Sequence, residues 1–519
     1  MKIKYLTTSL AGLLAAFTAL TAADITVPRI IDSDTTWTAD NTYILTEQSF
    51  VVTPDGAADP TVLTIEPGTV VKGVVSTGTS AAALIITRGA RIHAEGTVTR
   101  PIIFTSELDE FDGSLGPDDS GLWGGVIVLG NASISSRADS EIVPAPVVDQ
   151  VEGIEATGDQ IALASFGGTD DDDNSGVIRF VSIRHGGARI GGDNEINGLT
   201  LGGVGRNTTV EYVEIFANKD DGVEWFGGTV NARYLAVAFG QDDSFDYDQG
   251  WRGNGQYWFT IGKDSGSDRM DKGGEHDGAT APVDATPLGE AFVFNATYIG
   301  IGDSLQPDGS PARSNTALNI RDNASANYHN SVFLDFAKMI DIENDNEDRF
   351  NAGAIDFQNN VWWSHISENN SADGFNGRPD GNVDPTIFWT DAARDNVIAD
   401  PMLTGVSRAA EGALDPRPMP GSPALTGPFA TVPEGEFFEQ TNYKGAFAPD
   451  NNWLIGWTKL STEGYLAENP SWVFTEQYGW IFTFSGNLSP DQWVVSLSLD
   501  KYIYLGSDDA SGSWVFIPR

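Results

Sequence analysis

Acidic side chains recur at matching positions of two segments, 210–228 and 232–250, that lie 22 residues apart. The acids are Asp220, Asp221 and Glu224 in the first segment and Asp242, Asp243, Asp246 and Asp248 in the second. If the segments stack as neighbouring strands, about 4.8 Å apart, each aligned carboxylate pair repels by roughly 3–4 kcal/mol at an effective dielectric constant near 20. Calcium would relieve this repulsion, because it takes many oxygen ligands in flexible geometry. These acids are therefore a predicted calcium site. The alternative is solvated carboxylates, screened by salt or paired with Lys219, Arg233 or Arg252.

Basic side chains near these acids could act as proton acceptors. Polysaccharide lyases remove a sugar proton with Lys, Arg or His while a cation neutralises the uronate carboxylate. The candidates for such a catalytic base are Lys219, Arg252, Lys272 and His276. The last two lie in a charged segment, 262–278, that is typical of an excursion between coils, and exposed loop charges are the alternative interpretation. A glycoside hydrolase would use two carboxylates about 5–10 Å apart, for which this acidic sequence offers no selective pattern.

Other patterns that could carry chemistry are weak. The acidic run 170–173 precedes a β-rich segment, and it is either a second ion site or a solvated loop. Neither acidic region has the spacing of an EF-hand loop. The five histidines show no paired metal-ligand spacing, and neither a phosphate-binding loop nor a nucleophile-elbow motif is present.

The overall composition narrows the function classes. The 519 residues include 73 acidic and 30 basic side chains, for a formal net charge of −43, and no cysteine. Without cysteine there is no disulfide framework, thiolate-ligated zinc site, iron–sulfur cluster or cysteine nucleophile. We expect no nucleic-acid partner, because phosphate binding needs clustered Lys and Arg. The same charge would repel polyuronate substrates unless a groove were locally positive.

The elements that position the acids are short β-rich runs separated by Gly, Asp, Asn and Ser turns, from about residue 35 to residue 363. The offset of 22 residues also aligns the apolar alternation, with Val213 matching Leu235 and Ile215 matching Val237. A period of this length suits one coil of a parallel β-solenoid, whereas a propeller blade needs about 40 residues. The sequence therefore predicts an all-β fold, a right-handed parallel β-helix, in which stacked coils complete one another's core.

Asparagine precedes several of the later apolar runs, at Asn295, Asn330 and Asn359. Asparagine tolerates the left-handed backbone conformation of tight turns, and its side-chain amide can stack between coils. We therefore expect these asparagines at the turns of the solenoid.

The two ends of the chain depart from this pattern. Residues 1–23 contain two lysines, an apolar stretch and small residues near the end, which is typical of a secretory signal peptide. We expect residues 24–60 to cap the solenoid, 61–414 to form it, and the Pro- and Gly-rich segment 415–466 to be a C-terminal cap and linker. Residues 467–519 contain short aromatic runs with polar turns, which predict a small antiparallel β module. No other stretch is long and apolar enough to span a membrane.

Seven long segments carry a resemblance to a known family. They are FGGTDDDDNSGVIRFVSIRHGG (166–187), INGLTLGGVGRNTTVEYVEI (196–215), NKDDGVEWFGGTVNARYL (218–235), DDSFDYDQGWRGNGQYW (242–258), ADPMLTG (399–405), DPRPMPGSPA (415–424) and NNWLIGWTKL (451–460). Their order resembles that in bacterial secreted or outer-membrane β-helix proteins, a family that includes a leptospiral outer-membrane lipoprotein. The C-terminal aromatic runs resemble a tail module of Verrucomicrobia-type secreted proteins.

The resemblance implies a right-handed parallel β-helix similar to the pectin-lyase fold and a surface or extracellular location in a Gram-negative bacterium. It implies no known reaction and brings no catalytic residues with it. No cysteine follows the apolar N-terminal stretch, so we expect the lipid anchor of the lipoprotein members to be absent here.

Together these observations predict an exported cell-surface or extracellular structural or binding protein that is stabilised by Ca²⁺ and contacts polysaccharide or cell-envelope components. No enzymatic activity is expected. The first alternative is a polysaccharide lyase or glycoside hydrolase on the same scaffold. The second is an adhesin that acts through the aromatic residues of the C-terminal module.

Overall fold

The computed structural model describes residues 23–135, 146–152, 154, 161–190, 196–264, 269–279, 282–302, 315–364, 370–376 and 382–467, and the backbone of five strands between 471 and 516. Apart from its last residue, the expected signal peptide lies outside these ranges. Short strands dominate, and the longest α-helix described has five residues. None of the helices in these ranges has the length and apolar character that crossing a membrane requires.

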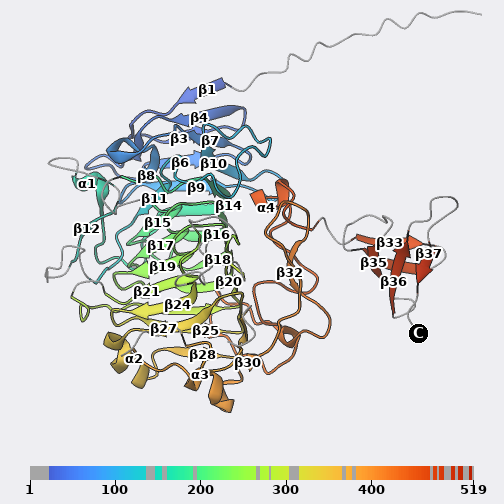
Figure 1. Cartoon of the computed structure of the whole chain (residues 1–519). Helices are drawn as coiled ribbons and strands as arrows, with labels where there is room; N and C mark the ends of the chain where they lie inside the picture. The colour runs from blue at the N-terminus through green and yellow to red at the C-terminus, as the bar shows by residue number, and fades with distance from the viewer. Residues whose placement is uncertain are drawn as a thin grey trace, which may run out of the picture.

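Two parallel sheets run the length of the body, because each strand pairs with its counterpart in the next coil (Figure 1). The 18 described strands of sheet A are β1 (Ala23–Thr26), β3 (Thr35–Trp37), β4 (Asn41–Leu45), β6 (Val62–Ile65), β7 (Val70–Gly73), β9 (Arg91–Glu95), β10 (Ile102–Ser106), β14 (Gly176–Arg184), β16 (Thr209–Phe216), β18 (Ala232–Ala238), β20 (Asn254–Ile261), β22 (Glu290–Phe294), β23 (Thr297–Ile299), β25 (Ser325–His329), β26 (Val332–Leu334), β28 (Asp356–Gln358), β29 (Val361–Trp363) and β30 (Val397–Ile398). The ten described strands of sheet B are β2 (Ile30–Ile31), β5 (Gln48–Val51), β8 (Ala83–Ile86), β11 (Val126–Leu129), β15 (Leu199–Gly202), β17 (Val223–Phe226), β19 (Phe245–Asp248), β21 (Gly274–Asp277), β24 (Thr316–Arg321) and β27 (Lys338–Ile342). This is the right-handed parallel β-helix that the sequence predicts.

The strand register confirms the offset of 22 residues. Val213 of β16 lies opposite Leu235 of β18, and Glu224 of β17 lies opposite Asp246 of β19. The first coils differ from the expected cap, because β1 to β5, within residues 23–51, already pair in parallel with strands of the following coils.

One residue in each of seven coils bends sheet A into two faces. These residues form the corner row, and they are Phe180, Tyr212, Tyr234, Tyr257, Asn295, Asn330 and Asn359, with φ angles from 50° to 59°. Residues with a side chain rarely adopt this left-handed region, so the turn must be held by its neighbours. The four aromatic rings stack along the row with centroids 4.3 to 4.6 Å apart. The asparagines continue the row, as the sequence predicts.

The core is one continuous column between the sheets. It extends from Val27 in the first coil to Phe388 in the last, because the inward side chains of every coil pack on those of the next. Large aromatic rings fill its middle, where Trp225 and Trp258 stack with centroids 5.1 Å apart. Such stacking buries far more apolar surface than a single coil could bury alone.

A segment that follows the last coil returns along the outer surface of sheet A (Figure 1). We call residues 399–467 the strap; it contains the antiparallel pair β31 (Leu403–Val406) and β32 (Leu414–Pro418) and the short helix α4 (Lys459–Thr462). The edges of its Trp453 and Trp457 rings pack against the rings of Tyr212 and Tyr234 in the corner row. The segment expected to be a cap and linker, 415–466, therefore covers the side of the solenoid.

The remaining elements are small. The antiparallel pair β12 (Asp149–Gln150) and β13 (Ser165–Phe166) lies beside α1 (Ile161–Ala164), and α2 (Glu347–Asn351) and α3 (Ile387–Thr390) lie at the C-terminal end of the stack (Figure 1). At the C-terminus, β33 (Ser471–Thr475), β34 (Gly479–Thr483), β35 (Gln492–Ser496), β36 (Lys501–Gly506) and β37 (Trp514–Phe516) form an antiparallel meander. This confirms the predicted antiparallel module.

Candidate metal centre

Three neighbouring strands of sheet B repeat one pattern, in which an acidic residue stands between residues that face the core. The sequence of β17 is Val-Glu-Trp-Phe, that of β19 is Phe-Asp-Tyr-Asp, and that of β21 is Gly-Glu-His-Asp. Successive side chains of a strand point to opposite faces, so Trp225 and Tyr247 enter the core while the acids point outward. The register places Glu224, Asp246 and Glu275 in one column.

The outward acids gather into two overlapping groups. Asp221, Glu224 and Asp246 form the first group, and Asp243, Asp246 and Glu275 form the second. Within each group, one carboxylate oxygen of each residue lies within 4.8 Å of the others. All five side chains are buried. Because Asp246 belongs to both groups, they make one continuous set, which we call the acid cluster.

Four of the seven predicted metal ligands lie in the acid cluster. The other three are Asp220, Asp242 and Asp248. The first two lie in the turns that precede β17 and β19, where both approach Asp221. Asp248 occupies the next outward position of β19, and its charge helps to raise the pKa of Asp277, after the larger effect of burial. The structure therefore gathers the predicted acids along one edge of sheet B.

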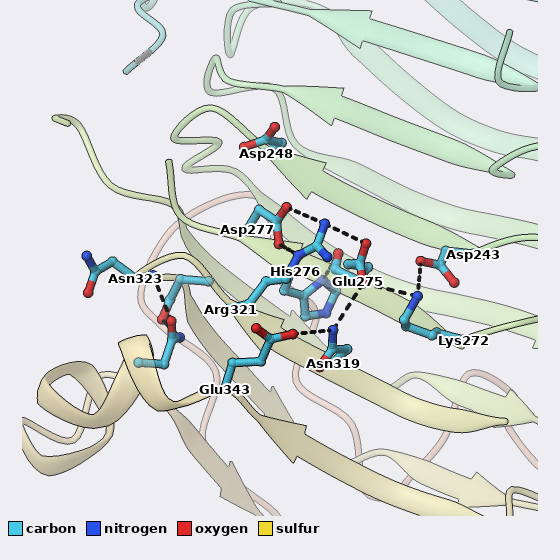
Figure 2. Close-up of polar contacts among 12 residues, drawn as sticks. Asp243, Asp248, Lys272, Glu275, His276, Asp277, Asn319, Arg321, Asn323 and Glu343 are labelled. Carbon is cyan, nitrogen blue, oxygen red and sulfur yellow. Dashed lines mark hydrogen bonds and ion pairs between the residues drawn. The ribbon is translucent and has the colours of Figure 1, made fainter. Parts of the chain in front are cut away.

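Two cations neutralise the C-terminal end of the acid cluster (Figure 2). Lys272 Nζ lies 3.2 Å from Asp243 Oδ2 and 3.0 Å from Glu275 Oε1. Arg321 Nη2 lies 2.9 Å from Glu275 Oε2. The same guanidinium group holds Asp277 through two hydrogen bonds, from Nε at 2.7 Å and from Nη2 at 3.0 Å. Such two-point contacts between arginine and a carboxylate are the strongest kind.

No cation of the described chain balances the N-terminal end of the cluster, since Asp221, Glu224 and Asp246 make no ion pair with a described Lys or Arg. Neutral groups donate instead, the Asn197 amide to Glu224 and the backbone N–H of Asp243 to Asp221 at 2.9 Å. Oδ1 of Asp246 and Oδ1 of Asp243 have no hydrogen-bond partner, although these side chains are only 9% and 3% exposed. Buried oxygens of this kind destabilise the fold unless a partner reaches them, and a cation is such a partner.

Burial and mutual repulsion shift the titration of these groups. Burial raises the pKa of Asp221, Glu224, Asp243 and Asp246, and neighbouring carboxylates raise each of them further. Lys272 opposes the shift at Asp243. The acid cluster therefore favours bound protons or a bound cation over free charge.

Of the four predicted bases, only Lys272 touches the acid cluster. Burial lowers its pKa, but the surrounding carboxylates outweigh burial and hold the pKa above its ordinary value, so the amine stays protonated. Arg252 lies elsewhere, with Nη2 3.1 Å from Asp171 Oδ2. Lys219 lies in the turn between β16 and β17, where its backbone N–H donates to Gly186 O. The structure does not bring these candidates together.

His276 lies inside the solenoid. Its ring stacks on Tyr247 with centroids 4.1 Å apart, and its Nε2 lies 2.8 Å from the Tyr328 hydroxyl oxygen. Burial lowers its pKa to about 3, so the ring is neutral at physiological pH. Part of the segment 262–278, expected as an excursion between coils, is therefore strand β21 of sheet B.

The sequence predictions missed Glu275, Asp277 and Arg321. A signal was present, because GGEHDG (273–278) is a third copy of the pattern in GVEWFG (222–227). The fixed offset did not reach it, since the coil that leads to β21 is longer than the preceding one.

The second acidic run fixes a loop. Asp171 accepts a hydrogen bond from the backbone N–H of Ser133 at 3.0 Å and pairs with Arg252. Asp173 accepts from the Asn131 amide and from the Ser175 hydroxyl, both at 3.0 Å. These contacts use the carboxylates within the protein, which favours the loop interpretation over a second ion site.

Comparison with known proteins gives one match. The family described as pectate-lyase like beta helix domain matches residues 29–388, which contain every strand of the acid cluster. No curated protein and no solved structure matches the chain.

Proposed function

Because the chain belongs to the pectate-lyase-like β-helix domain family, we propose that it is an exported structural or binding protein whose β-helix is stabilised by calcium and contacts polysaccharide or cell-envelope components. The family supplies the scaffold. The acid cluster supplies the cation site, and the observation that carries the proposal is the buried, unpartnered Oδ1 of Asp246 between Asp221 and Glu224.

Calcium fits this cluster better than other common ions. The groups offer carboxylate oxygens alone, which suit hard cations. Calcium tolerates irregular geometry and takes six to eight oxygens, including both oxygens of one carboxylate and water, whereas Mg²⁺ demands a near-ideal octahedron and retains several waters. Neighbouring strands dictate the positions of Glu224 and Asp246, so the tolerant ion is favoured.

A catalytic role is less favoured by the same contacts. A lyase needs a basic group that is free to accept a proton, and Lys272 is held protonated among three carboxylates. His276 is committed to the core, and Arg252 is paired with Asp171. The candidates nearest the cation site therefore serve as counter-ions or core residues.

The test of the proposal is thermal unfolding with calcium and with chelator. We expect millimolar Ca²⁺ to raise Tm by several degrees, because a ligand present at 100 times its Kd stabilises by about 2.7 kcal/mol. Asp246→Asn should remove most of this increase, whereas the exposed Asp59→Asn, in an early coil, should retain it. An unchanged Tm with calcium and with chelator would remove the proposal.

Polysaccharide contact is tested by co-sedimentation of the full chain with insoluble plant and marine polysaccharides in calcium. The lyase alternative predicts a rise in absorbance near 232 nm with soluble polyuronates, and the hydrolase alternative predicts new reducing ends. Either activity would replace the proposed function if Lys272→Ala or Arg252→Ala abolished it. A chain lacking residues 468–519 separates the adhesin alternative, because that alternative alone predicts that binding disappears with the aromatic module.

A further inference from the structure

We propose that the ammonium group of Lys272 occupies a second cation position of the acid cluster, so that the cluster takes one calcium ion and would take two without this lysine. The inference rests on the proposed calcium binding and adds the number of ions and the reason for it.

The geometry of the cluster defines two neighbouring positions. The group formed by Asp221, Glu224 and Asp246 and the group formed by Asp243, Asp246 and Glu275 each bring three carboxylate oxygens together. Asp246 is shared, so it would bridge cations at the two positions. Glu224 and Asp246 are adjacent in the sheet, as are Asp246 and Glu275, which separates the positions by about one strand spacing, ~4.8 Å.

The first position has acids but no internal cation within the described chain. Its three carboxylates receive hydrogen bonds only from neutral donors such as the Asn197 amide and the Asp243 N–H. Oδ1 of Asp246 receives none. An external cation is the group that satisfies this position.

The second position already holds a positive charge. The Lys272 ammonium lies 3.2 Å from Asp243 Oδ2 and 3.0 Å from Glu275 Oε1, and a third contact to Asp271 Oδ2 at 2.8 Å anchors it (Figure 2). The side chain is only 17% exposed, so the ammonium is screened from solvent together with its partners. A lysine carries a compact charge with three donors, and these three contacts use all of them.

One difference between lysine and calcium shows what removal of Lys272 would leave. Lysine supplies a single charge to the position, and Oδ1 of Asp243 remains without a partner beside it. Without the ammonium, Asp243, Asp246 and Glu275 would present three buried carboxylates and no internal cation except Arg321, which binds the far oxygen of Glu275. Such a site resembles the first position in its donors and should bind the same ion.

The experiment is to count bound calcium by isothermal titration calorimetry and equilibrium dialysis of the full chain. We expect Asp246→Asn to bind one ion fewer than the wild type, and Lys272→Gln to bind one ion more. Lys272→Arg should match the wild type because it keeps the charge. Lys338→Gln is the matched control, since Lys338 lies in the same column two strands further and is exposed, and it should also match the wild type.

The outcomes separate the two proposals. If the wild type binds no calcium at the cluster, the proposed function is overturned. If the wild type binds one ion there and Lys272→Gln also binds one or none, the lysine inference alone is overturned. Loss of two ions on Asp246→Asn would also overturn it, because calcium would then displace the lysine.

A second measurement uses the wild type, in case Lys272→Gln does not fold. Amine acetylation followed by mass spectrometry should leave Lys272 unmodified in the calcium-loaded protein while the exposed Lys338 reacts. Acetylation of Lys272 after calcium loading, with protection in chelator, would show that calcium expels the ammonium and would overturn the inference.

Discussion

Glu214 accepts the backbone N–H of Lys459, 245 residues further along the chain, at a distance of 2.7 Å. The second carboxylate oxygen accepts the N–H of Leu460 at 3.2 Å, so one buried side chain on β16 holds the first turn of α4 against sheet A. Arg184, also buried, provides the balancing charge. This contact fixes the strap to the solenoid.

We expect Glu214→Ala to destabilise the protein by about 3–5 kcal/mol, because it leaves a buried arginine uncompensated and two N–H groups without acceptors. The measurement is chemical denaturation together with limited proteolysis, in which the strap should become the earliest site of cleavage. Glu434→Ala, an exposed change within the strap, is the control. Equal protease resistance of the two variants would contradict the role of Glu214.

The aromatic contacts of the strap give a second prediction. Trp457 is fully buried, packs its edge on Phe180 with centroids 5.7 Å apart and donates from Nε1 to Trp453 O at 2.7 Å. Trp457→Ala should lower the free energy of unfolding by about 3–5 kcal/mol, and Trp457→Phe should lower it less because the ring contact survives. Equal losses in the two variants, measured by chemical denaturation, would show that the ring packing contributes little.

The acid cluster makes calcium-free stability depend on pH. The pKa of Asp221, Glu224, Asp243 and Asp246 is raised by burial and then by neighbouring carboxylates. A carboxyl group with a raised folded pKa binds protons more tightly in the folded state, so its contribution is complete below its ordinary pKa and is lost as pH rises. In chelator, Tm should therefore fall between pH 5 and pH 8, and calcium should reduce this fall. A Tm that rises over the same range in chelator would contradict this reading of the cluster.

A carboxyl pair outside the cluster titrates closer to neutrality. Burial, a hydrogen bond with Asp345 and repulsion from that carboxylate raise the pKa of Asp322 to about 7. The stability from its proton should be lost as pH rises through 7, so in calcium the wild type should lose more Tm between pH 6 and pH 8 than Asp322→Asn, by roughly 1 °C. The effect is small because Asp322 is partly exposed. Parallel Tm profiles for the two proteins would show that this proton does not contribute.

The period of the coils and much of the cation site could be predicted from the sequence because both follow from local repetition. The match of Val213 to Leu235 and of Glu224 to Asp246 is a match of strand alternation, and strand pairing reproduces it in space. The asparagine turns are similar, since Asn295 and Asn330 have a conformational tolerance that belongs to the residue itself.

The positions of Arg321 and of the strap could not be predicted in this way. Arg321 reaches Asp277 across a coil of different length, so no constant offset relates the two residues. The strap follows sheet A because its tryptophans meet a row of rings such as Tyr212 and Tyr234. That row exists only after the coils have bent at the same place, which no single segment of sequence contains.

The strap has a consequence for the order of folding. Contacts between residues as distant as Glu214 and Lys459 form slowly, because the intervening chain must first be ordered. Synthesis delivers the coils before residues 453–460 exist, so the stacked rings of the corner row are exposed on the nascent protein and are sealed only at the end. A polypeptide that stops short of Trp453 would keep this apolar stripe on its surface, where a second unfinished chain could bind it.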